Sequence, residues 1–118
     1  LGNVKFLFPN RHSVYMHDTP TKHLFNQRVR AYSHGCMRVR NPRNFAEALL
    51  RDQGWSIKRI NQTIASGRHD INVSLEPKIP VHIMYFTLWA DENGRLQRFS
   101  DVYGHDQRVL SALRSARS

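Results

Sequence analysis

The spacing of apolar residues changes near residue 41 from the two-residue period of strands to the period of a helix, and this change constrains the fold more than any other feature. Residues 3–8 and 12–17 alternate in the way that short strands do. Residues 21–41 are polar and have no clean period. We expect them to form a long loop with one helical turn near residues 22–25, and long ordered loops are often functional.

Two helices follow the loop. Asn41 is suited to the N-cap position of the first helix and Pro42 to its first turn, and Gly54 can end it. Ser56 is suited to cap the second helix, which Gly67 can end. Because the apolar residues of each segment fall on one face, we expect a helical pair that packs on a sheet. These apolar residues are Phe45, Ala46, Leu49, Leu50, Ile57, Ile60 and Ile64.

The last third of the chain returns to strand character. Residues 70–76 alternate, and residues 80–90 give the strongest strand pattern in the chain. Residues 91–94 predict a hairpin turn, with a returning strand at 95–99. A final amphipathic segment at residues 106–116 predicts a helix. The order of strands, loop, helices, strands and helix predicts an α+β fold with a mainly β core.

Composition is that of one folded domain, which we expect to cover residues 1–118. Hydrophobic residues make up 40% and charged residues 23%, which are values of a folded chain, so we do not expect disorder. No apolar run reaches the 18 or so residues of a membrane span, so we expect no stable membrane insertion. The chain begins at Leu1 without a signal-peptide pattern, so we expect it to come from a longer protein with any targeting signal upstream.

Positive charge dominates, with 18 basic residues against 9 acidic ones and a formal net charge of +9. Such a charge favours nucleic acid, an anionic membrane surface or an acidic wall polymer, and does not choose among them. Several arginines lie close to a cysteine in the sequence. They form a solvated basic surface, or they stabilise a thiolate and attract a substrate carboxylate. These arginines are Arg28, Arg30, Arg38, Arg40 and Arg43.

Cys36 is the single cysteine, so it cannot form a disulfide within the chain. A lone cysteine is more often a small buried apolar residue than a catalyst. A reactive thiolate needs a base nearby, and two histidines are candidates: His34, two positions earlier, and His17, at the end of a predicted strand. Gly35 lets the backbone approach closely, so that the Gly35 and Cys36 N–H groups could face an oxyanion. These residues permit acyl transfer by a cysteine.

The motif Ser33-His34-Gly35-Cys36, preceded by His17 with 15 residues between His17 and Ser33, resembles the signature of the L,D-transpeptidase catalytic domain (YkuD-type) family. The flanking sequences resemble the large Gram-negative branch of this family. They are Phe8-Pro9-Asn10, Met16-His17-Asp18-Thr19-Pro20, Leu24-Phe25, Arg30-Ala31, Cys36-Met37-Arg38-Val39, Pro80-Val81-His82-Ile83, Trp89-Ala90-Asp91 and Asp101-Val102-Tyr103-Gly104. The likeness therefore extends over nearly the whole chain.

The resemblance implies the catalytic roles. Cys36 is the acylated nucleophile, and His17 is its general base. Asp18 orients His17, usually through its backbone carbonyl. The backbone amides of Gly35 and Cys36 form the oxyanion hole.

The resemblance also implies supporting residues. Ser33 and His34 shape the pocket, and Arg38 lies close to the substrate. No metal or organic cofactor is required. The fold implied is a mainly β L,D-transpeptidase-like domain that lacks the strands found in the family before the position of Leu1. An exposed strand edge would then invite self-association.

The implied substrates are peptidoglycan stem peptides, and the implied location is the periplasm or cell envelope. Cys36 attacks the amide between the third stem residue and the terminal D-Ala, and D-Ala leaves. An amine of another stem then takes the acyl group, which gives a 3→3 cross-link. Lipoprotein attachment and hydrolysis, as in an L,D-carboxypeptidase, are variants on the same intermediate. Carbapenems are expected to acylate Cys36.

Two other classes of function stay open from the residues alone. A zinc site could use the ligand-rich stretch, although its spacing matches no common zinc motif. Its candidate ligands are His12, His17, His23, His34 and Cys36. A basic nucleic-acid-binding module could use the net charge with Phe25, Tyr32 and Trp55, but no binding motif is present, and we expect no nucleic-acid partner.

Overall fold

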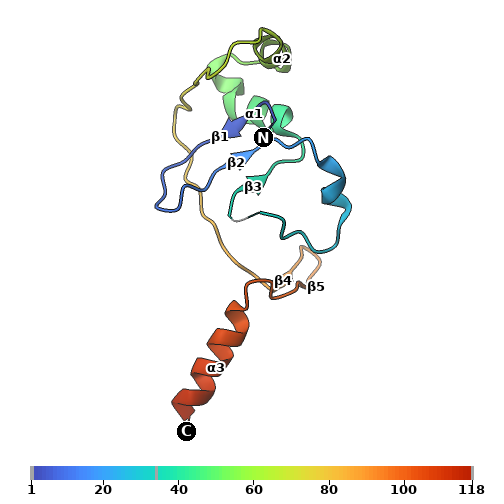
Figure 1. Ribbon diagram of the computed structural model, residues 1–118, viewed down its shortest axis with the longest axis vertical. Coiled ribbons are helices and arrows are strands. Elements are labelled where there is room, and N and C mark those ends of the chain that lie inside the picture. Colours follow the sequence, from blue (N-terminus) through green and yellow to red (C-terminus); the bar gives the residue numbers. More distant parts are fainter. Residues whose placement is uncertain (1, 34, 118) are drawn as a thin grey trace. The chain divides into compact units, whose positions relative to one another are not determined.

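Three very short strands form the sheet of the first of two compact units, Leu1–Val81 and His82–Ser118 (Figure 1). The computed structural model describes residues 2–33 and 35–117. The strands are β1 (Lys5–Phe6), β2 (Met16–His17) and β3 (Met37–Arg38), in the order β1-β2-β3. The extension of a single domain over residues 1–118 stays a prediction.

The central strand β2 pairs in both directions. It is antiparallel to β1, with Phe6 opposite Met16, and parallel to β3, with His17 opposite Arg38. The connection between β1 and β2 is held by the Asn10 side chain. Its amide donates to the carbonyl of Val14 at 2.7 Å and its oxygen accepts from the Val14 N–H at 3.0 Å. This local bonding is typical of asparagine in turns and fixes the loop from which β2 emerges.

The helical segments begin where the sequence predicts. The loop after β2 contains the 3-10 helix η1 (Lys22–Asn26), and the helical pair is α1 (Pro42–Leu50) and α2 (Ile57–Ala65). The short 3-10 helix η2 (Arg51–Gln53) extends α1, and Gly54 ends it with a left-handed φ of 84°.

The two predicted N-caps differ. Ser56 accepts a hydrogen bond from the Arg59 N–H at 3.2 Å, so it caps α2 as expected. Asn41 occupies the N-cap position of α1, but its side chain makes no capping hydrogen bond. The predicted N-cap position of Asn41 and the place of Pro42 in the first turn are therefore confirmed, without a capping bond from the Asn41 side chain.

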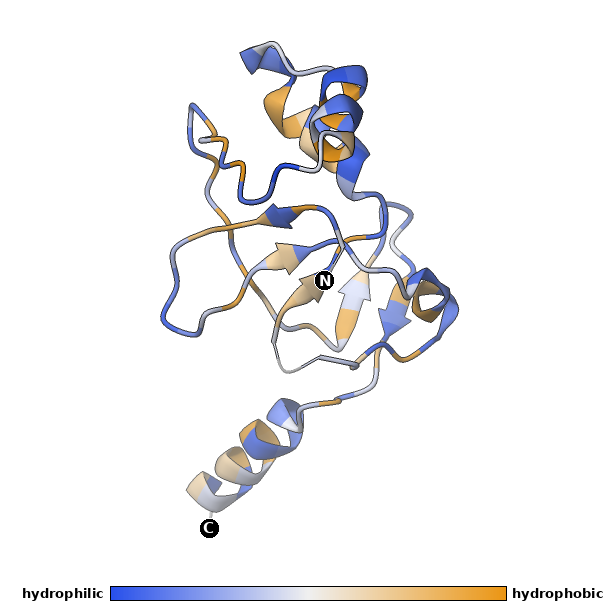
Figure 2. Cartoon of the chain, turned by 45° about the horizontal axis from the view of Figure 1, so that its top comes forward, coloured by the Kyte–Doolittle hydropathy of each residue, from blue (hydrophilic) through white to orange (hydrophobic). Residues whose placement is uncertain are grey.

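The helical pair packs on the sheet through α1. The rings of Phe6 in β1 and Phe45 in α1 meet edge to face, with centroids 4.9 Å apart. Ala46 of α1 and Ile60 of α2 are buried, at 7% and 5% exposure, and so is Pro42 at the start of α1. Figure 2 shows hydrophobic and hydrophilic residues side by side on the helices, as their amphipathic pattern requires. Short strands and the helices together confirm the α+β fold class.

The second unit contains a hairpin and a helix. β4 (Leu88–Ala90) pairs antiparallel with β5 (Leu96–Arg98), and the Asp91 carboxylate accepts backbone N–H groups within the predicted turn. The helix α3 (His105–Arg117) follows. Its first turn is held by Asp101, which accepts a hydrogen bond from the Gln107 N–H at 3.2 Å.

The predicted strands at residues 70–76 and 80–90 are mostly wrong. Of the two, the structure forms only β4, and residues 70–86 have no regular strand assignment. The alternating side chains are present, but Val73, Val81 and Ile83 remain 40%, 42% and 58% exposed. A strand requires a neighbour for its backbone hydrogen bonds, and the pattern of one segment does not supply that neighbour.

Within residues 2–33 and 35–117, every helix is too short or too polar to span a lipid bilayer.

Candidate active site

Strand pairing brings the segment that carries His17 beside the segment that carries Cys36. The Met37 N–H donates to the Tyr15 carbonyl at 3.1 Å, and the Val39 N–H donates to the His17 carbonyl at 2.8 Å. Paired strands lie about 4.8 Å apart. Cys36 therefore enters β3 alongside β2, although the two segments are distant in sequence.

The His17 ring is oriented by its own backbone neighbour. Nδ1 lies 2.5 Å from the carbonyl oxygen of Asp18. Because a carbonyl only accepts, Nδ1 carries the hydrogen in this contact and the lone pair lies on Nε2. The ring is buried, and Tyr15 packs beside it with the ring centroids 5.7 Å apart. An imidazole fixed in this way is suited to accept a proton at Nε2.

The Cys36 thiol is free and half-buried, so the sulfur is not sealed in an apolar interior. It lies 4.0 Å from the carbonyl oxygen of Ser13, to which it can donate a hydrogen bond. Among the described residues, the thiol makes this contact and no hydrogen bond to the His17 ring. The strand register places Arg38 opposite His17, with Cys36 two residues before Arg38, and the thiol itself faces Ser13.

The turn before Cys36 is tied together by Ser33. Its hydroxyl donates to the Cys36 carbonyl at 2.5 Å and accepts from the Gly35 N–H at 3.4 Å. Gly35 has a φ of 147°, where glycine is favoured, and a Cβ there would meet Val14 at 3.3 Å. His34, the other supporting residue of the motif, lies outside the described residues.

Of the arginines near Cys36 in the sequence, Arg38 is the one placed in β3, opposite His17. Its guanidinium donates to the Thr21 hydroxyl at 3.3 Å, which links β3 to the loop after β2. Arg30 donates to the Phe25 carbonyl and Arg43 to the Asn61 side chain. These two are therefore engaged by other parts of the chain.

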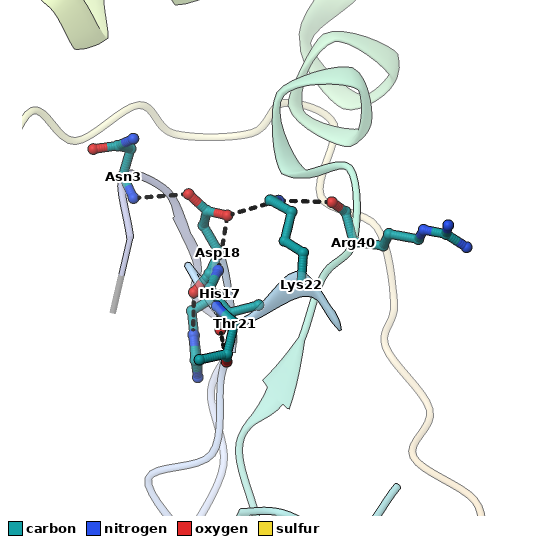
Figure 3. A network of polar contacts seen from close by, with 7 residues as sticks. Asn3, His17, Asp18, Thr21, Lys22 and Arg40 are labelled. Carbon is teal, nitrogen blue, oxygen red and sulfur yellow. Dashed lines mark hydrogen bonds and ion pairs between the residues drawn. The ribbon is translucent and has the colours of Figure 1, made fainter. Parts of the chain in front are cut away.

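The Asp18 carboxylate is the centre of a polar network that Figure 3 shows from close by. It accepts hydrogen bonds from the N–H groups of Asn3 and Thr19 at 3.1 and 2.7 Å. The Lys22 ammonium lies 3.2 Å from the same carboxylate and donates to the Arg40 carbonyl at 2.8 Å. Burial by itself would raise the pKa of Asp18, but the donors from Asn3, Thr19 and Lys22 hold the pKa below its usual value.

Sequence reasoning predicted Asp18 and missed Lys22 and Asn3. The four-residue spacing of Asp18 and Lys22 is a visible signal for an ion pair. The contact of Lys22 with Arg40 depends on the chain returning through β3, which the spacing cannot reveal.

A cavity of about 590 Å³ opens beside this network. Its polar lining includes Asp18, Thr19, Lys22, Arg40, Asn41, Arg43, Asn44 and Asn61. A second depression, of about 560 Å³, lies at Arg38 and Phe45. Neither is lined by Cys36 or His17, so the thiol does not lie within either depression.

Residues 2–33 and 35–117 contain no cluster of three or more His, Cys, Asp or Glu side chains that could hold a metal ion. The candidate zinc ligands that the structure describes, which do not include His34, therefore give the zinc alternative no support.

The comparisons with known proteins agree with the resemblance found in the sequence. Residues 1–83 match the family of L,D-transpeptidase catalytic domains named YkuD. A protein of Haemophilus influenzae that carries the provisional name L,D-transpeptidase is 38% identical over 109 residues, which is 92% of this chain. The chain belongs to the family of L,D-transpeptidase catalytic domains, and it spans 22% of the length of that relative.

Proposed function

We propose that this chain acts as a peptidoglycan L,D-transpeptidase by cysteine acyl transfer, with Cys36 as the nucleophile and His17 as the base. One observation supports this most strongly. The His17 ring is fixed through Nδ1 on the Asp18 carbonyl, on the strand that pairs with the strand following Cys36. Family membership supplies the type of reaction.

The first step activates the thiol. In the proposed step, Sγ of Cys36 leaves the Ser13 carbonyl and approaches Nε2 of His17. Catalytic hydrogen bonds are often long in the absence of substrate and shorten when it binds. Nε2 accepts the thiol proton, and the thiolate attacks the carbonyl carbon between the third stem residue and D-Ala. A carbon–sulfur bond forms, and negative charge develops on the carbonyl oxygen.

The oxyanion is then stabilised by backbone N–H groups. The amides of Gly35 and Cys36 are suited to this role because they adjoin the nucleophile. The Gly35 N–H has a long contact to the Ser33 hydroxyl, and this weak bond is exchanged for one to the oxyanion. Ser33 keeps its bond to the Cys36 carbonyl and so holds the turn in place.

The second half transfers the acyl group. The carbon–nitrogen bond breaks, His17 returns its proton to the leaving D-Ala amine, and a thioester remains on Cys36. The amine of a second stem peptide attacks this thioester and gives up a proton to His17, which returns it to the thiolate. The product is a 3→3 cross-link, and no metal or organic cofactor takes part. Arg38, which lies opposite His17, is suited to attract a stem carboxylate.

The location follows from the substrate. Peptidoglycan lies in the cell envelope, so we place the reaction in the periplasm. The positive charge of the chain suits an acidic wall polymer better than a nucleic acid, for which no binding motif is present. Self-association through an edge of the β1-β2-β3 sheet is a further part of the proposal, which light scattering would test.

The direct test uses tetrapeptide stems and mass spectrometry. Wild-type protein should release D-Ala, carry a transient thioester on Cys36 and form 3→3 dimers. Cys36→Ala should do none of these, whereas His12→Ala, which changes an exposed histidine, should match the wild type. Release of D-Ala with tripeptide as the sole product would favour the L,D-carboxypeptidase alternative. Release by Cys36→Ala would contradict both.

A further inference from the structure

Lys22 has no role in the acyl transfer described above, yet it joins the ends of the two strands that carry the reaction. We propose that Lys22 is a positioning residue for the proposed reaction: it clamps Asp18 to Arg40 and so fixes the carbonyl that orients the His17 base. The proposal rests on the function proposed for His17 and Cys36, and Figure 3 shows the contacts.

The first part of the clamp holds Asp18. The backbone N–H of Asp18 donates to the Val4 carbonyl at 2.9 Å, and its carboxylate accepts from Asn3, Thr19 and Lys22. Bonds at both the backbone and the side chain leave this residue little freedom to rotate. Its carbonyl is therefore held where Nδ1 of His17 can donate to it.

The second part of the clamp reaches β3. Arg40 follows Val39, whose N–H donates to the His17 carbonyl, and the Arg40 carbonyl accepts from the Lys22 ammonium at 2.8 Å. Lys22 thus lies across the carboxyl ends of β2 and β3. A shift of Arg40 along the sheet would move the Cys36 segment relative to His17, and Lys22 opposes that shift through one bond to each side.

The expected effect is on position more than on stability. The Lys22 side chain is 51% exposed, and an ion pair as exposed as this contributes little to the free energy of unfolding. Catalytic rates depend far more steeply on geometry, because a misplacement of about 1 Å can slow a reaction on the order of 100-fold.

The test measures the rate of alkylation of Cys36 by iodoacetamide at pH 7, in which sulfur displaces iodide and the thiol proton passes to His17. Lys22→Met should slow this alkylation about tenfold, from loss of positioning. Lys22→Arg, which keeps two donors and the charge, should recover most of the rate.

Arg51→Met is the matched control, because it removes a second ion pair of the same spacing, Arg51 with Glu47, in the helical segment. It should leave the alkylation rate unchanged. Nitrogen NMR of the histidine ring gives a second readout, in which Lys22→Met should lose the single Nδ1–H tautomer of His17 expected in the wild type.

A Lys22→Met alkylation rate equal to that of the wild type overturns the proposal, and so does an equal loss of rate in Arg51→Met. The function proposed for His17 is tested separately by His17→Ala. If Lys22→Met has no effect while His17→Ala strongly slows alkylation, the positioning role fails and the base role stands. If His17→Ala leaves the rate unchanged, the base role fails as well.

Discussion

At the scale of single residues, the two groups of the proposed chemistry are held by different means. His17 is fixed by a short contact to Asp18 and by burial. Met37, directly after Cys36, pairs with Tyr15, the Ser33 hydroxyl donates to the Cys36 carbonyl, and the Cys36 thiol contacts the Ser13 carbonyl. In the proposed mechanism, the thiol turns towards the fixed base and becomes reactive as substrate enters.

The charge of Asp18 makes stability depend on pH. Its folded pKa is lower than the usual 3.8, so its contribution is fully present above that value and is lost as the pH falls through the folded pKa. Asp18→Asn should lower the free energy of unfolding at pH 6 by about 1–2 kcal/mol, as expected for hydrogen bonds to a charged group. Urea unfolding at pH 6 and at pH 3 measures this.

At pH 3, the free energies of unfolding of the wild type and of Asp18→Asn should lie closer together, because the wild-type carboxylate has lost part of its stabilising contribution. Asp52→Asn is a suitable control because Asp52 is exposed in η2. An Asp18→Asn penalty that is as large at pH 3 as at pH 6 would contradict the account of the ionised carboxylate.

At the scale of elements, the helices could be predicted and most of the later strands could not. Capping residues and the helical period act within a few residues, so α1, α2 and α3 begin close to their predicted positions. The 91–94 turn is local in the same sense. A strand needs a neighbouring strand for its backbone hydrogen bonds. The alternating pattern at residues 70–86 describes one strand and does not specify that neighbour.

The candidate site shows the same division between local and distant information. The resemblance implied the contact of the Asp18 carbonyl with His17, which joins adjacent residues. The parallel pairing of β2 with β3 and the bond from Lys22 to Arg40 depend on how the loop returns, and no spacing in the sequence encodes that return. The contact of the Cys36 thiol with Ser13 could not be predicted for the same reason.

The two helix N-caps give a prediction at this scale. Ser56→Ala should lower the free energy of unfolding by about 1 kcal/mol, because it removes the bond to the Arg59 N–H. Asn41→Ala should change it by less than half as much, because the Asn41 side chain makes no capping bond. Thermal or urea unfolding of both variants measures this. Equal losses from the two changes would contradict the difference between the caps.

At the scale of the whole molecule, the described sequence forms two compact units and spans 22% of the length of its Haemophilus influenzae relative. The family match covers residues 1–83, which includes every element of the candidate site. The site is thus contained within the first unit. Its chemistry can be tested on Cys36 and His17 themselves, whatever the acyl acceptor is.

The most direct measurement is the mass of the intact protein after reaction with a carbapenem, followed by peptide mapping. The account predicts one adduct on Cys36 in the wild type, none in Cys36→Ala, and a rate at least about 100-fold lower in His17→Ala, since a positioned base contributes on this order. An adduct that forms on Cys36→Ala, or a His17→Ala variant that reacts at the wild-type rate, would contradict the pairing of this thiol with this imidazole.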